Sequence, residues 1–60
     1  MNNIPPVMTR KEAQDILKIS KNTILELLKN GYLASFTIKG RYRITREALL
    51  EFIQNSVYYS

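Results

Sequence analysis

The sequence contains no cysteine and no histidine among its 60 residues. Their absence excludes a disulfide framework, a zinc site built from Cys and His ligands, and catalysis by a thiol or an imidazole. A chain of this length removes only about 60% of its unfolded surface from water, so its stability must come from a small core alone. We therefore expect one small domain that binds no metal and no cofactor.

Long apolar runs are also missing. A helix that crosses a membrane needs roughly 20 consecutive apolar residues, and no apolar stretch of the sequence approaches that length. The N-terminal sequence MNNIPPVMTR does not have the basic segment and long apolar segment of a secretory signal peptide. We expect no membrane partner and a cytoplasmic location.

Acidic residues are few, with five Asp and Glu against nine Lys and Arg, for a formal net charge of +4. A basic balance favours a nucleic-acid partner, although the same charge also suffices to keep a small domain soluble. The acidic residues are spread over predicted helix caps and outer faces and do not converge with a nucleophile or with metal ligands. The sequence therefore does not indicate an enzyme.

Three helices are predicted from their first residues and their apolar spacing. Thr9 and Glu12 form a capping box, and Ser20 and Thr45 are the next two N-caps. The first helix is expected to end near Lys18, and the "NG" pair at residues 30 and 31 ends the second. The predicted buried stripes are Ala13, Ile16 and Leu17, then Ile24, Leu27 and Leu28, then Leu49, Phe52 and Ile53. The short turn between the first two helices makes them a helix-turn-helix candidate.

The stretch YLASFTIKGRYRI, residues 32–44, changes to a period of two and predicts a β-hairpin. A two-residue loop would pair Ile38 with Arg41 and put a cation on the apolar face. An odd loop pairs Ile38 with Tyr42 instead and keeps that face apolar. We predict the odd loop, which consists of Lys39, Gly40 and Arg41.

This order of elements predicts an α+β fold, a small winged helix-turn-helix with two helices, a basic hairpin as the wing and a third helix. In such a fold the second helix enters the major groove of DNA, and the wing lies over the backbone or the minor groove. Cations at the wing tip would meet phosphates, and Gly40 would permit a left-handed tip and a close approach. Arg10 is a further candidate for a phosphate contact. The alternative is that the wing cations only protect an exposed sheet edge.

The polar side of the second helix is the predicted reading surface. Asn22 can pair with adenine, and Glu26 can accept from the amino group of cytosine. Asn22 and Thr23 could equally be capping residues, and Glu26 a solvated partner of Lys29. Lys21 and Lys29 suit phosphates better than bases. The predicted DNA-binding residues are Lys21, Asn22, Thr23, Glu26, Lys29, Lys39, Gly40, Arg41 and Arg43.

Residues 8–53 resemble the excisionase-type helix-turn-helix DNA-binding domain, a relative of the MerR winged-helix group. The resemblance rests on "EA" at 12 and 13, "S..T" at 20 to 23, "NG.L" at 30 to 33, "GRYRI" at 40 to 44 and "AL..F" at 48 to 52. The family pattern usually has glycine in place of Lys18 and a basic residue in place of Glu26. The change at Glu26 shifts the expected affinity to Lys21, Lys29 and the wing, because phosphate repels a carboxylate.

The resemblance implies a small architectural protein that binds double-stranded DNA near the attachment sites of a phage or mobile element. Such proteins bend DNA and set the direction of recombination by a tyrosine recombinase (integrase). The implied protein is cytoplasmic and nucleoid-associated, of prokaryotic or phage origin. The first alternative is a small transcriptional regulator of phage, plasmid or mobile-element genes, and the second is a protein-interaction module.

Three segments are expected along the chain. Residues 1–8 form an extended N-terminal arm, because Pro5 and Pro6 exclude helix, although Val7 and Met8 could pair as a short strand. Residues 9–55 form the DNA-binding domain and residues 56–60 a C-terminal tail. A second apolar stripe near this end predicts weak self-association or packing onto the protein's own core, and it consists of Leu50, Ile53 and Val57, followed by Tyr58 and Tyr59.

Overall fold

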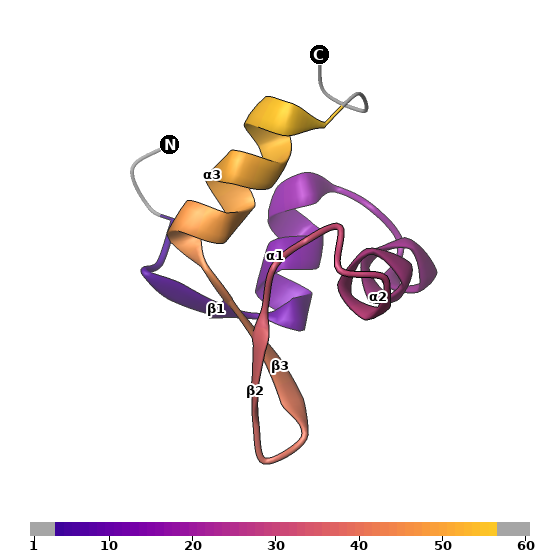
Figure 1. Cartoon of the computed structure of the whole chain (residues 1–60), viewed down its shortest axis with the longest axis vertical. Helices are drawn as coiled ribbons and strands as arrows, with labels where there is room; N and C mark the ends of the chain where they lie inside the picture. The colour runs from indigo at the N-terminus through magenta and orange to yellow at the C-terminus, as the bar shows by residue number, and fades with distance from the viewer. Residues whose placement is uncertain (1–3, 57–60) are drawn as a thin grey trace.

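The computed structural model of the chain describes residues 4–56. Its elements are β1 (Val7–Thr9), α1 (Arg10–Leu17), α2 (Lys21–Lys29), β2 (Phe36–Ile38), β3 (Arg41–Thr45) and α3 (Arg46–Asn55). The strands form one antiparallel sheet in the order β1-β3-β2. In Figure 1 the helices gather at one end of the molecule, and the β2–β3 hairpin projects away from them. The predicted α+β winged helix-turn-helix fold is confirmed, and no helix among these residues could cross a membrane.

Each helix begins at the hydroxyl residue predicted as its N-cap. The Thr9 hydroxyl accepts from the Glu12 N–H at 3.1 Å, and the Glu12 carboxylate accepts from the Thr9 N–H at 2.8 Å, which completes the capping box. Ser20 accepts from the Thr23 N–H at 3.2 Å, and Thr45 caps α3 in the same way. These bonds satisfy backbone donors that have no partner inside the helix, so they define where each helix starts.

The first two helices end in left-handed backbone. Lys18, the C-cap of α1, has φ 58° and ψ 46°, a conformation that costs a residue with a Cβ about 1–2 kcal/mol. Gly31 has φ 77° after α2. Its N–H donates to the Leu28 carbonyl at 3.3 Å, and the Tyr32 N–H donates to the Leu27 carbonyl at 2.9 Å. This bond pair is a Schellman motif, so the predicted glycine stop is confirmed.

One apolar core joins the helices to the sheet. Its buried residues come from every element except β2 and include Leu33 from the loop before it: Met8, Ala13, Leu17, Ile24, Leu27, Leu28, Leu33, Ile44 and Leu49. The predicted stripe of α2 is fully buried, and Phe52 and Ile53 of α3 are half-buried against the core. The prediction for Ile16 is wrong, because it is 36% exposed. It lies about 80° around the helix from the midpoint of Ala13 and Leu17, beyond the inward face of this short helix.

The loop of the wing also differs from the prediction. Ile38 lies opposite Arg41, so the loop has two residues, and the predicted odd loop is wrong. Lys39 and Gly40 have φ 52° and 77°. Positive φ at both central positions is the signature of a type I′ turn, whose twist matches that of the flanking strands. The argument for the odd loop assumed a buried face on β2, yet all three residues of that strand are exposed.

The observed register divides the side chains of the sheet between two faces. Phe36 pairs with Arg43, and Thr37 pairs with Tyr42. Because paired residues of an antiparallel sheet point to the same side, Arg43 shares the outer face with Phe36, which is 43% exposed. Tyr42 and Ile44 point to the other side, where Ile44 is buried in the core. The wing therefore carries its arginines and its exposed apolar side chains on one surface.

The end of the predicted N-terminal arm is part of the fold. Val7 and Met8 lie in β1, which pairs with β3, and Met8 is only 1% exposed. Arg46 also binds the residues that precede β1. Its backbone N–H donates to the Pro6 carbonyl and its guanidinium donates to the Ile4 carbonyl, both at 3.0 Å. The short strand is thus confirmed. The division into arm, domain and tail stays a prediction, and residues 57–60 of the tail lie outside the described residues.

Candidate nucleic-acid interface

The outer face of α2 presents exposed polar side chains. Lys21, Asn22, Glu26 and Lys29 are exposed, and Leu25 among them is half-buried. They are positioned by the opposite face of the helix, whose apolar stripe is anchored in the core. Within residues 4–56 the Glu26–Lys29 ion pair that the spacing permits is not formed. These side chains are therefore oriented outward as a set and are not neutralised by one another.

Two neighbouring polar residues in the first turn of α2, Asn22 and Thr23, have different surroundings. The Ser20 and Thr23 hydroxyl oxygens are 2.9 Å apart, and Ser20 also accepts from the Thr23 N–H. Thr23 is therefore engaged at the cap. Asn22, in contrast, makes no side-chain hydrogen bond to the part of the chain that the structure describes. Its amide keeps its donors and its acceptor for another molecule.

The wing tip gathers three of the predicted residues. Lys39 and Gly40 form the turn, Arg41 begins β3, and all three are exposed. Arg43 lies further along β3, half-buried, where its guanidinium donates to the Tyr42 carbonyl at 3.0 Å. That acceptor is neutral, so the charge of Arg43 remains uncompensated. The wing is in effect a cationic arm that extends beyond the helical part of the molecule (Figure 1).

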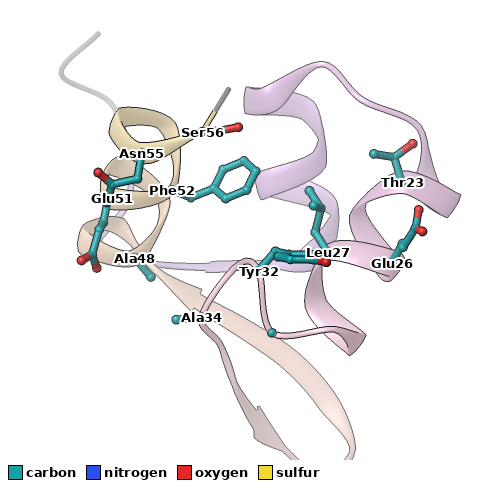
Figure 2. A pocket seen from close by; sticks show the side chains of 11 residues that line it. Thr23, Glu26, Leu27, Tyr32, Ala34, Ala48, Glu51, Phe52, Asn55 and Ser56 are labelled. Carbon is teal, nitrogen blue, oxygen red and sulfur yellow. The ribbon is translucent and has the colours of Figure 1, made fainter. Parts of the chain in front are cut away.

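A groove of about 600 Å³ lies between α2 and α3. Figure 2 shows Thr23 and Glu26 on its α2 side, Glu51 on its α3 side and the ring of Phe52 pointing across it toward Leu27. No Lys or Arg lines this groove, so its carboxylates disfavour phosphate here. Among the described residues these carboxylates are not part of a group of three or more metal-ligating side chains.

A second groove, of about 400 Å³, lies between the start of α1 and the wing. It is lined by four cationic side chains, Arg10, Lys11, Arg41 and Arg43, and by no carboxylate. Sequence reasoning places Arg10 only as a further phosphate candidate and misses Lys11. The adjacent basic pair after the N-cap was the available signal, but its proximity to the wing depends on the pairing of β1 with β3.

Residues 7–56 match the family model described as a helix-turn-helix domain, which covers most of the chain. No curated protein and no solved structure matches the chain. The family match covers all six elements of the structure, from β1 to α3. It therefore includes both α2 and the wing.

Proposed function

Because the chain belongs to the helix-turn-helix domain family, we propose that it binds double-stranded DNA sequence-specifically, with α2 in the major groove. The wing then lies against the backbone or the adjacent minor groove. In this arrangement Asn22 and Glu26 face base edges, and Lys21 and Lys29 face phosphates. Thr23 borders the same surface but is held by the Ser20 cap, so its contribution is to position the first turn of α2.

The observation that carries this proposal is a set of cations without acidic partners. Lys21, Lys29, Lys39, Arg41 and Arg43 are exposed or half-buried, and none forms an ion pair within the described residues. Cations without an acidic partner keep their full charge available for phosphates. Each phosphate contact contributes about −0.9 to the slope of log K against log salt.

Salt dependence therefore tests DNA binding directly. We expect a slope of roughly −4 to −5 for five phosphate contacts, measured by fluorescence anisotropy with a labelled duplex. A slope near zero would contradict the proposal. If no duplex is bound at moderate salt while the circular dichroism spectrum shows an intact fold, the protein-interaction alternative is favoured instead.

We further propose an excisionase-like role, in which the protein is an architectural factor for site-specific recombination of a mobile element. Support comes from the resemblance of residues 8–53. One module of this kind covers only about 600–1,000 Å² of surface and binds a single site modestly. Useful occupancy then needs adjacent copies or a recombinase partner, such as a tyrosine recombinase (integrase), on the DNA of a prokaryotic cell or phage.

Footprinting on the DNA that flanks its gene, followed by a recombination assay, separates this role from the alternative. We expect several adjacent protected sites beside an attachment site, and excision that depends on the protein. Protection confined to a promoter, without any effect on excision, would favour the small transcriptional regulator. Both roles use the same fold, so only the position of the bound sites distinguishes them.

Weak self-association on DNA remains part of the proposal. Leu50 of α3 is 43% exposed, whereas Ile53 is half-buried against the core. The rest of the proposed contact, Val57, Tyr58 and Tyr59, lies outside the described residues. Deletion of residues 57–60 should reduce the cooperativity of binding to a DNA with several sites. If cooperativity is unchanged, the tail is not the contact.

A further inference from the structure

The groove between α1 and the wing brings together cations from two distant parts of the sequence. Thr9 pairs with Arg43 across β1 and β3, so the residues that follow Thr9 start α1 beside the wing. Arg10 and Lys11 thus line one side of the groove, and Arg41 and Arg43 the other.

Two of the four groove cations, Arg10 and Arg43, are oriented by hydrogen bonds to neutral groups. The Arg10 guanidinium donates to the side-chain oxygen of Gln14, and Arg43 donates to the Tyr42 carbonyl at 3.0 Å. Neither partner carries a charge. These bonds therefore fix the direction of two guanidinium groups and leave their charge available.

The other two cations are free to respond to a ligand. Lys11 forms an ion pair with Asp15 at 3.7 Å, but both side chains are about two-thirds exposed, at 70% and 65%. Such exposed pairs are weak, so Lys11 can exchange its partner. Arg41 has no hydrogen bond or ion pair to the residues that the structure describes.

We propose that this groove binds one phosphodiester group of the DNA backbone and so ties the wing to the start of α1. The assignment rests on the proposed function and adds to it a contact that involves Arg10 and Lys11. The forked donors of arginine match the paired oxygens of a phosphate group. A phosphate between the two sides of the groove attracts the cations of α1 and those of the wing. In the DNA complex it therefore sets the position of the wing relative to the helices.

The backbone of DNA is a better source of this phosphate than a free anion. The groove is open, with two of its four cations exposed and the other two half-buried, so a lone phosphate ion would compete with water and salt for each contact. A duplex held at α2 and the wing tip brings its phosphates to the groove at high effective concentration. No side chain at Gly40 obstructs this approach.

The test uses Arg10→Gln and Lys11→Gln in the full chain, with Lys18→Gln as the matched control. Lys18 carries the same charge but lies at the other end of α1. Because both residues contact the same phosphate, each groove variant should flatten the salt slope by up to about 0.9 and weaken binding up to about fivefold at 0.15 M salt, on random and specific duplexes alike. The control should change both clearly less. Melting curves check the fold, and Lys11→Gln keeps the test valid if loss of the Arg10–Gln14 bond lowers stability.

A duplex series in which single phosphates are replaced by neutral methylphosphonates identifies the contact. One replacement should weaken the wild-type protein about fivefold and weaken Arg10→Gln clearly less, because the variant has already lost part of that contact. If every replacement affects both proteins equally, or if Lys18→Gln acts like the groove variants, the assignment is wrong and only general electrostatics remain. Displacement of the duplex from this groove by millimolar inorganic phosphate at constant ionic strength would also overturn it.

These results are separable from the proposed function. If the wild-type protein binds no duplex at all, the proposed function fails first. If the wild type binds with the expected slope and the groove variants behave as wild type, only the phosphate assignment fails.

Discussion

Asn22 and Ser20 lie in the same turn at the start of α2 but should have opposite roles. Replacement of Asn22 by alanine removes an exposed amide that makes no hydrogen bond within residues 4–56. The free energy of unfolding should therefore change by no more than about 0.5 kcal/mol. Replacement of Ser20 by alanine removes the oxygen that accepts from the Thr23 N–H. Its loss should cost about 1 kcal/mol, or roughly 4–8 °C in melting temperature for a domain of this size.

The DNA measurements should show the reverse order. An amide that pairs with one base edge contributes about 1–3 kcal/mol of discrimination, so Asn22→Ala should weaken binding to the true site roughly 5- to 150-fold. Binding to random duplex should hardly change, because phosphate contacts dominate it. The folded molecules of the Ser20→Ala variant should show the same preference at that base pair as the wild type.

The assay compares anisotropy titrations on the footprinted site, on variants of that site and on random duplex, with thermal melts followed by circular dichroism. Asn22→Ala should relax the preference at one base pair only. If it weakens both DNAs equally and also lowers the melting temperature, Asn22 is a capping residue and the base-reading hypothesis is wrong.

Four further changes test the wing, the turns and the core. Arg41→Ala should flatten the salt slope by about one unit and weaken specific and random DNA alike; unchanged titrations would mean that the wing tip does not touch DNA. Lys18→Gly should raise the free energy of unfolding by up to about 1 kcal/mol in thermal melts, because glycine relieves the left-handed backbone, whereas Lys18→Ala removes the same charge without that gain. Lys39→Asn should stabilise the type I′ turn against heat yet weaken DNA binding about fivefold, and an increase in both would show that Lys39 meets no phosphate. Ile44→Ala should cost about 2–5 kcal/mol by denaturant titration, since this core residue is fully buried, and a smaller loss would mean that the site collapses around the deletion.

The local features of the fold could be predicted because their interactions span only a few residues. The capping box at Thr9, the caps at Ser20 and Thr45 and the glycine stop at residue 31 each depend on hydrogen bonds to a neighbouring turn. The stripe of α2 follows in the same way from helical spacing, because this helix is covered along its whole apolar side. With the order of the elements, these features sufficed to predict a winged helix-turn-helix.

The two wrong predictions share one physical cause. Both assumed that an apolar side chain faces the core because its own element has an apolar face. Ile16 follows the spacing of a stripe, but the short α1 turns only Ala13 and Leu17 inward. Ile38 alternates like a half-buried strand residue, but β2 extends beyond the helices that could cover it (Figure 1). Which face is covered depends on what packs against the element, and a local pattern does not contain that information.

The sequence by itself determined where the helices start, where α2 stops and which of its residues face outward, because capping bonds and helical periodicity act within a few residues. Only the tertiary structure decided the type I′ turn of the wing and the division of its side chains between two faces. It alone also placed Arg10 and Lys11 beside Arg41 and Arg43. That placement depends on pairing between β1 and β3, which lie far apart in the chain, and non-local pairing follows from the packing of the whole domain.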